Sequence, residues 1–166
     1  MSNTVFHRQV TPEEKQQIDE ILQHLHQQKL LVINPRRKNG LILYKPYHAE
    51  FAGPGAAIGS NFDQDVIDVL PVGKLSLTEP RTSQERINSY LIRRQWVKLA
   101  KQISDNTVAQ QRAQVILNQF EHWFDLETAN VLPDETFALL VGVLPQTMRK
   151  VRTQNELLSQ ESLKKN

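Results

Sequence analysis

The sequence contains no cysteine and no long hydrophobic run, and both absences exclude classes of protein. Without cysteine there are no disulfides and no thiolate-bound metals, which is typical of a reducing intracellular compartment. The longest apolar stretch, residues 137–144, is far shorter than the roughly 20 residues that a membrane-spanning helix needs. Residues 1–10 also lack the basic and then apolar layout of a secretory signal. We therefore expect a soluble cytoplasmic protein with no membrane partner.

The net charge is small, but the charges are unevenly distributed along the chain. The formal charge is +2, which by itself predicts no polyanionic partner. Residues 81–104, however, carry six Lys or Arg against one Asp or Glu, whereas residues 105–133 carry one against four. A smaller basic cluster follows at Arg149, Lys150 and Arg152. Salt screens the field of exposed charges beyond a Debye length of about 8–10 Å. The local charge of a segment, more than the net charge, therefore decides what that segment attracts.

The beginning of the chain predicts one helix and a β-hairpin. Thr11-Pro12-Glu13-Glu14 has the pattern of a helix start with a capping box, and apolar residues at helical spacing continue to about Gln28. Residues 30–33 and 41–44 are β-prone, and an Asn-Gly pair lies in the segment between them. Since Asn and Gly tolerate positive φ, we expect these two runs to form a hairpin.

A soft domain boundary is expected near residue 80. Residues 52–62 are small and Gly-rich, which predicts a loop, and residues 66–72 are interpreted as a strand. Pro71, Gly73 and Pro80 then interrupt regular structure before the helical half of the chain. The sequence thus predicts an N-terminal helix plus β-hairpin region over residues 1–80 and a helical domain over residues 81–166.

The second half of the chain has helical periodicity almost throughout. Capping residues and apolar spacing predict helices over residues 83–104, 106–124, 134–141 and 145–154. Asp134 is expected to cap the third of these helices, and residues 159–166 are expected to fray. The predicted fold class is mostly α with a small β-hairpin (α+β), in which the last three helices form one C-terminal unit.

Residues 134–153 have the features that two short helices need to cross around a tight turn. Ala138 is a small residue at the expected crossing point, and Gly142 suits a turn where φ is positive. The apolar residues that would close a miniature core are Phe137, Val141, Val143, Met148 and Val151. This segment resembles the helix-turn-helix superfamily of DNA-binding proteins, and the resemblance covers these residues alone. The same pattern also occurs in helical hairpins that serve only the fold.

The resemblance implies a recognition helix at about residues 145–154, lying in the major groove of duplex DNA. The implied contacts are Gln146, Arg149, Lys150 and Thr153 toward the bases, with Thr147 and Arg152 near phosphates. Gln can pair with an adenine edge and Arg with a guanine edge.

A second group of basic residues lies on the predicted helix 83–104. Arg86, Arg93, Arg94 and Lys98 would add salt-dependent affinity if this helix lay along phosphates. The alternative is a solvated helix face that pairs with the acidic residues of segment 105–127, and the sequence does not choose between the two.

No local pattern predicts catalysis, a cofactor or a metal site. The Gly-rich residues 53–59 lack the Gly-Lys-Ser/Thr ending of a phosphate-binding loop. Asp63-x-Asp65-x-x-Asp68 lacks the Gly and the distal Glu of a calcium loop, so we interpret it as a solvated turn. His24 and His26 are two residues apart on a helix and point in nearly opposite directions, so they cannot share a metal.

These observations predict a sequence-specific duplex DNA-binding regulator of transcription that is not an enzyme. A homodimer is expected, because most helix-turn-helix proteins read paired half-sites. The first alternative is a non-enzymatic adaptor or assembly factor whose helical half binds a protein partner. The second is a catalytic protein that uses the region of residues 63–68, which would need a cleft holding carboxylates of raised pKa. The sequence identifies no small-molecule effector.

Overall fold

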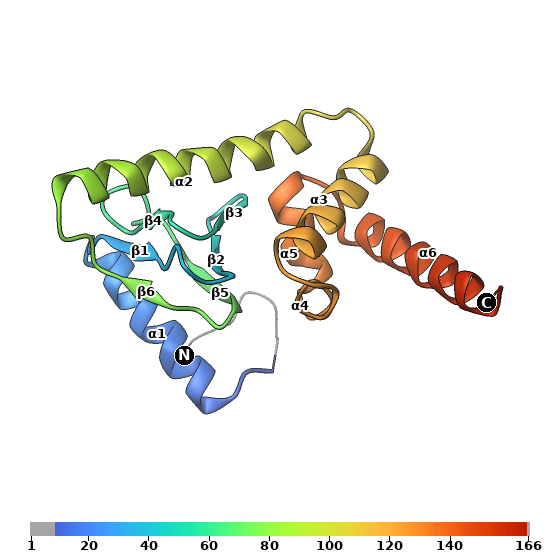
Figure 1. Ribbon diagram of the computed structural model, residues 1–166, viewed down its shortest axis with the longest axis horizontal. Coiled ribbons are helices and arrows are strands. Elements are labelled where there is room, and N and C mark those ends of the chain that lie inside the picture. Colours follow the sequence, from blue (N-terminus) through green and yellow to red (C-terminus); the bar gives the residue numbers. More distant parts are fainter. Residues whose placement is uncertain (1–8, 166) are drawn as a thin grey trace. The chain divides into compact units, whose positions relative to one another are not determined.

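A computed structural model of the chain describes residues 9–165, and its elements are labelled in Figure 1. Residues 1–8 and residue 166 lie outside this description. Residues 1–8 make up most of the segment that was compared with a secretory signal. The chain divides into two compact units, an N-terminal unit of residues 1–100 and a C-terminal unit of residues 101–166. Helices predominate and strands occur in the first unit, so the expected mixed α+β class is confirmed.

The elements follow one another in a simple order along the chain. The N-terminal part contains α1 (Pro12–His26), β1 (Leu31–Ile33), β2 (Asn39–Tyr44), β3 (Ala49–Ala52), β4 (Ala57–Ile58), β5 (Asp68–Gly73), β6 (Leu77–Thr78) and α2 (Ser83–Ser104). The C-terminal part contains α3 (Ala109–Trp123), α4 (Leu126–Asn130), α5 (Asp134–Val141) and α6 (Pro145–Lys164).

Helix α1 begins as its sequence predicts. The Thr11 side chain accepts a hydrogen bond from the backbone N–H of Glu14, and the Glu14 carboxylate accepts one from the backbone N–H of Thr11. This reciprocal pair satisfies two donors that have no partner within the helix. Ile18, Ile21 and Leu25 then form the buried face of α1.

The six strands form two antiparallel sheets of three strands each, with orders β4-β1-β6 and β3-β2-β5. The predicted hairpin is therefore wrong, because β1 and β2 belong to different sheets. The Asn-Gly pair does not form its turn, since Asn39 and Gly40 are the first residues of β2. The buried Asn39 side chain instead donates to the carbonyls of Asn34 and Arg37 and accepts from the N–H of Ser76.

The segment predicted as a Gly-rich loop also contains sheet residues. Ala52 ends β3, and β4 lies within the segment at Ala57–Ile58. Strands β2 and β3 form a hairpin, in which Leu41 is opposite Ala52 and the Lys45 N–H donates to the His48 carbonyl. The predicted strand at residues 66–72 corresponds to β5 and pairs with β2 along its whole length.

Helices α1 and α2 lie on opposite sides of the strands of the N-terminal unit (Figure 1). Ile18, Ile21 and Leu25 from α1 contribute to the core, together with residues from strands β1 to β5. Ile92 and Trp96 from α2 pack against the same core. The unit is thus built as a layer of short strands between two amphipathic helices.

Most of α2 belongs to the N-terminal unit, so the division of the chain falls about 20 residues beyond the expected boundary. The contact between Trp96 and Gly53 is one physical reason. A Cβ atom at Gly53 would lie 2.3 Å from the Trp96 ring, so the indole occupies the space that any larger residue would fill. Trp96 also stacks edge-on against Phe51, with ring centroids 5.2 Å apart.

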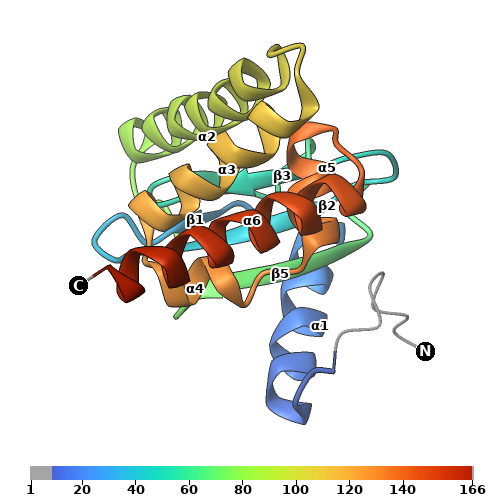
Figure 2. The same ribbon diagram turned by 90° about the vertical axis from the view of Figure 1, so that its right-hand side faces the viewer.

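The C-terminal unit is a bundle of four helices. In Figure 2, α6 crosses in front of α3 and α5, and α6 contacts both of them. Phe120 and Phe137 are fully buried and pack edge-on at 5.2 Å, with Met148 of α6 in the same core. The helix α4 was not predicted, and α6 continues to Lys164 where a fraying tail was expected.

Within residues 9–165, no helix is both long enough and apolar enough to cross a membrane.

Candidate nucleic-acid interface

The turn between α5 and α6 depends on Gly142. This residue caps α5 in the left-handed region, with φ 67° and ψ 45°, which a residue with a Cβ adopts at a cost. The N–H groups of Gly142 and Val143 both donate to the Ala138 carbonyl. Asp134, which was expected to cap α5, is its first helical residue, and Pro133 holds the cap position without a side-chain bond.

Arg112 of α3 holds the end of α5 in place. Its Nε donates to the Val141 carbonyl at 3.1 Å, and its Nη2 donates to the Gly142 carbonyl at 3.0 Å. These are carbonyls at the C-terminus of a helix, which have no partner within the helix and favour positive charge. Arg112 therefore fixes the point from which the chain turns into α6.

Helix α6 buries one face and exposes the other. Met148 and Val151 are buried, at 0% and 3% exposure, whereas Gln146, Arg149, Lys150 and Thr153 are all exposed. The exposed four residues stand at positions i, i+3, i+4 and i+7, so they form one stripe along the helix. We call these four residues the α6 stripe. Along the sequence, residues 136–155 contain three basic residues and no acidic one.

Arg152 is held within the C-terminal unit instead of pointing into solvent. Its Nη1 donates to Asp134 Oδ1 at 2.8 Å, and its Nη2 donates to the Ala129 carbonyl at 3.0 Å. The guanidinium also lies over the Phe137 ring, 4.8 Å from its centroid. The expectation that Arg152 lies near a phosphate is corrected accordingly, because its donors tie α6 to α4 and α5. Thr147, the other predicted phosphate contact, is half-buried at the start of α6.

Arg93 requires the same correction on α2. Its side chain is 6% exposed, and both terminal nitrogens donate to the fully buried Asp63 carboxylate, at 2.9 and 3.0 Å. Arg93 also donates to the Ala57 carbonyl and lies over the Phe62 ring. It therefore anchors α2 to the N-terminal unit. The other predicted α2 contacts, Arg86, Arg94 and Lys98, are exposed.

Asp63 is part of a buried network of charges, not of a solvated turn. Lys45 forms ion pairs with Asp63, Glu50 and Asp65, and Arg93 forms ion pairs with Asp63 and Glu50. Burial alone would raise the pKa of Glu50, but the charges of Arg93 and Lys45 outweigh it and lower that pKa.

The other acidic and histidine residues that the structure describes do not converge on a metal site. Asp68 begins β5 and is buried, and its Oδ1 accepts from the N–H of Val69. The His26 ring contacts the Val66 carbonyl at 2.9 Å. Across residues 9–165, no group of three His, Asp or Glu side chains is placed to hold a metal ion.

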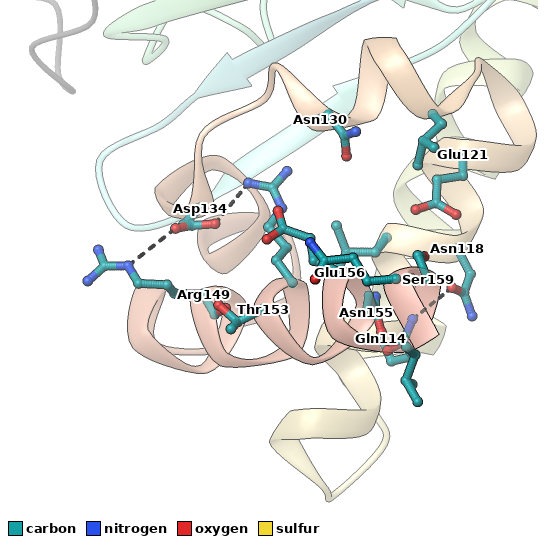
Figure 3. A pocket seen from close by; sticks show the side chains of 15 residues that line it. Gln114, Asn118, Glu121, Asn130, Asp134, Arg149, Thr153, Asn155, Glu156 and Ser159 are labelled. Atoms are coloured by element: carbon teal, nitrogen blue, oxygen red, sulfur yellow. Dashed lines mark hydrogen bonds and ion pairs between the residues drawn. The ribbon is translucent and has the colours of Figure 1, made fainter. Parts of the chain in front are cut away.

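An open groove of about 940 Å³ lies between α3, α4 and α6 of the C-terminal unit (Figure 3). Its walls carry amide and carboxylate side chains, among them Asn118, Glu121 and Glu156, and its apolar part includes the exposed Leu126 and Leu158. Arg149 and Thr153 of the α6 stripe lie at its edge, as does Asp134. The sequence contains no local signal for this groove, because its walls come from three separate helices.

Comparisons with known proteins return no match, since no family model, no curated protein and no solved structure matches the chain.

Proposed function

We propose that the C-terminal unit binds duplex DNA sequence-specifically, with α5 and α6 as a helix-turn-helix and α6 in the major groove, in a non-enzymatic regulator of transcription. The observation that carries this proposal is the α6 stripe. Gln146, Arg149, Lys150 and Thr153 point away from the core on one side of one helix, while the opposite side is buried. An α-helix fits the major groove of B-form DNA, and its outward residues then face the base edges.

The chemistry of the α6 stripe suits base recognition. Gln146 has an amide that can pair with adenine, and Arg149 has a guanidinium that can pair with guanine in a bidentate manner. Lys150 supplies a charge for a phosphate, and the Thr153 hydroxyl already donates to the Arg149 carbonyl, which leaves its oxygen as an acceptor. Arg86, Arg94 and Lys98 of α2 are proposed as further phosphate contacts, because their side chains are exposed.

The proposal is tested by fluorescence anisotropy of a labelled mixed-sequence duplex, titrated at several salt concentrations. The test variant is Arg149→Ala/Lys150→Ala. Each lost phosphate contact reduces the slope of log affinity against log salt by about 0.9. We expect the variant to bind more weakly than wild type and to have a salt slope smaller by about 1, from the lost phosphate contact of Lys150.

The matched control is Lys164→Ala/Lys165→Ala. It removes the same charge from the far end of α6, more than ten residues beyond the stripe, where both side chains are exposed. We expect this control to bind within about threefold of wild type, since only long-range electrostatics change. Equal losses in the two variants would indicate non-specific attraction to basic residues. No binding of wild type at low salt would overturn the proposal.

We also propose that the protein acts as a homodimer, because helix-turn-helix proteins usually read two half-sites related by a twofold axis. Sedimentation equilibrium over a range of concentrations tests this point. A monomer at all concentrations, with or without a selected DNA site, would overturn it.

An adaptor function is a second candidate, favoured by three exposed leucines near the end of α6. Leu157, Leu158 and Leu163 are 56%, 62% and 76% exposed, and exposed apolar patches can mark protein interfaces. In that case Leu157→Gln/Leu158→Gln would abolish association with a protein partner, while the Arg149→Ala/Lys150→Ala variant would retain it. Retained association in the leucine variant would exclude this surface as the docking site.

A further inference from the structure

A single carboxylate, Asp134, lies between two arginines of α6. Its Oδ1 accepts from Arg152 Nη1 at 2.8 Å, and its Oδ2 lies 3.7 Å from Arg149 Nε (Figure 3). Asp134 is the first residue of α5, so it reaches α6 across the turn. The two arginines differ in environment, because the side chain of Arg152 is 20% exposed and that of Arg149 is 68% exposed.

The Asp134 carboxylate is itself immobilised. Arg152 contacts it from one side and is in turn fixed by the Ala129 carbonyl and the Phe137 ring. The Asp134 side chain is 19% exposed, so little solvent competes for its oxygens. A fixed acceptor beside a long, exposed side chain restricts the directions in which that side chain can point.

We propose that Asp134 is a specificity-determining residue that orients Arg149 toward a guanine base, an inference that rests on the proposed DNA-binding function. The ion pair engages Nε of the guanidinium, which leaves the two terminal nitrogens unused. Figure 3 shows these nitrogens directed away from Asp134. Two parallel N–H donors are what the O6 and N7 acceptors of guanine require.

The ion pair acts on orientation more than on stability. An exposed arginine that pairs at 3.7 Å gains little free energy of folding. An arginine held in its binding geometry, however, loses less side-chain entropy when it meets a base. Asp134 therefore favours the one partner that fits the fixed geometry over phosphates and other bases, which a freely moving guanidinium would also contact.

The test begins with selection of a preferred duplex from a randomised library by wild type and by Arg149→Lys. The Lys variant keeps the charge and loses the two-pronged donor. We expect a guanine in the wild-type site whose replacement by adenine weakens wild-type binding about 5- to 150-fold, and which Arg149→Lys no longer distinguishes.

The second step compares Asp134→Asn with the matched control Glu135→Gln. Both remove one negative charge from the first turn of α5, so the two variants have the same net charge. We expect Asp134→Asn to lower the guanine preference by about two- to fivefold, the most that an exposed ion pair can supply, and Glu135→Gln to keep it. In the Arg149→Lys background, Asp134→Asn should have no further effect. A thermal melt of each variant, with Asp134→Glu as a charged replacement, identifies losses due to unfolding.

The outcomes separate the two proposals. Failure of wild type to select any site would overturn the DNA-binding proposal and this inference together. A selected site with an Arg149-dependent guanine, read equally well by folded Asp134→Asn and Glu135→Gln, would overturn only the role of Asp134. A site without such a guanine would overturn the assignment of Arg149, and of Asp134 with it.

Discussion

Replacing Arg93 by Met should destabilise the N-terminal unit by about 3–5 kcal/mol, the cost of removing one partner of a buried ion pair. Asp63 is fully buried and accepts two hydrogen bonds from Arg93. After the substitution, its remaining cation is Lys45, whose Nζ is 3.4 Å away. Because that pair is retained, we expect a loss near the lower end of the range.

The assay is urea unfolding followed by the fluorescence of Trp96, in a Trp123→Phe background so that the signal reports the N-terminal unit. Trp96 packs against Phe51 and Gly53 within that unit. With a denaturant slope of about 1–3 kcal/mol per molar, a loss of 3 kcal/mol lowers the unfolding midpoint by about 1–3 M. The matched control is Arg94→Met, which removes the same charge from the neighbouring, exposed position.

The result that would refute this reasoning is an equal, small change in both variants. The double variant Arg93→Met/Asp63→Leu provides an internal check. Apolar replacement of a whole buried pair is often neutral, so it should recover most of the loss. Because Arg93 anchors α2 and contacts no proposed base, folded Arg93→Met should keep its affinity for DNA within about threefold.

Three further predictions concern the turn and the charge network. Gly142→Ala should lower the free energy of unfolding, measured by thermal melting, by about 1 kcal/mol. The cost comes from backbone conformation alone, because the added Cβ would meet nothing within 4 Å. A loss above about 3 kcal/mol would contradict this. Arg112→Ala should lower the free energy of unfolding by about 2–3 kcal/mol, because two carbonyls at the end of α5 lose their donor. Urea unfolding followed by Trp123 fluorescence measures this loss, and an unchanged midpoint would exclude the role of Arg112. The lowered pKa of Glu50 contributes stability that is complete above about pH 4.5 and is lost as pH falls toward the folded-state pKa. Glu50→Gln should therefore flatten the acid limb of the pH–stability curve, and an unaltered limb would reject this assignment.

Elements whose signals are local could be predicted from the sequence. The capping box of α1, the span of α2 and the bounds of α5 depend on residues within one or two turns of each other. Pairing of the strands depends on distant residues, and there the prediction failed. Strand β1 pairs with β4 and β6, which lie more than 20 residues further along the chain. Asn39 had the chemistry of a turn residue and instead satisfies three backbone groups, two in the connection before β2 and one at Ser76.

The two adjacent arginines of α2 show why charge counts alone do not identify a binding surface. Arg93 and Arg94 belong to the same basic run, but a rotation of 100° per residue points the first at the core and leaves the second in solvent. The partner that decides this, Asp63, is 30 residues away. No periodicity in the sequence connects an aspartate of that loop with α2.

The α6 stripe could be predicted from local helix geometry, whereas the contact between Asp134 and Arg149 could not. Once Met148 and Val151 are assigned to the core, helix geometry alone turns Gln146, Arg149, Lys150 and Thr153 outward. The carboxylate that contacts Arg149 comes from the other side of the turn, and its position depends on Arg152 and the packing beneath it. If the proposal for this unit holds, residues that touch DNA follow from local periodicity, whereas the residue that aims one of them follows only from tertiary structure. Comparing Asp134→Asn with Arg149→Lys therefore measures the share of base preference that the tertiary structure supplies.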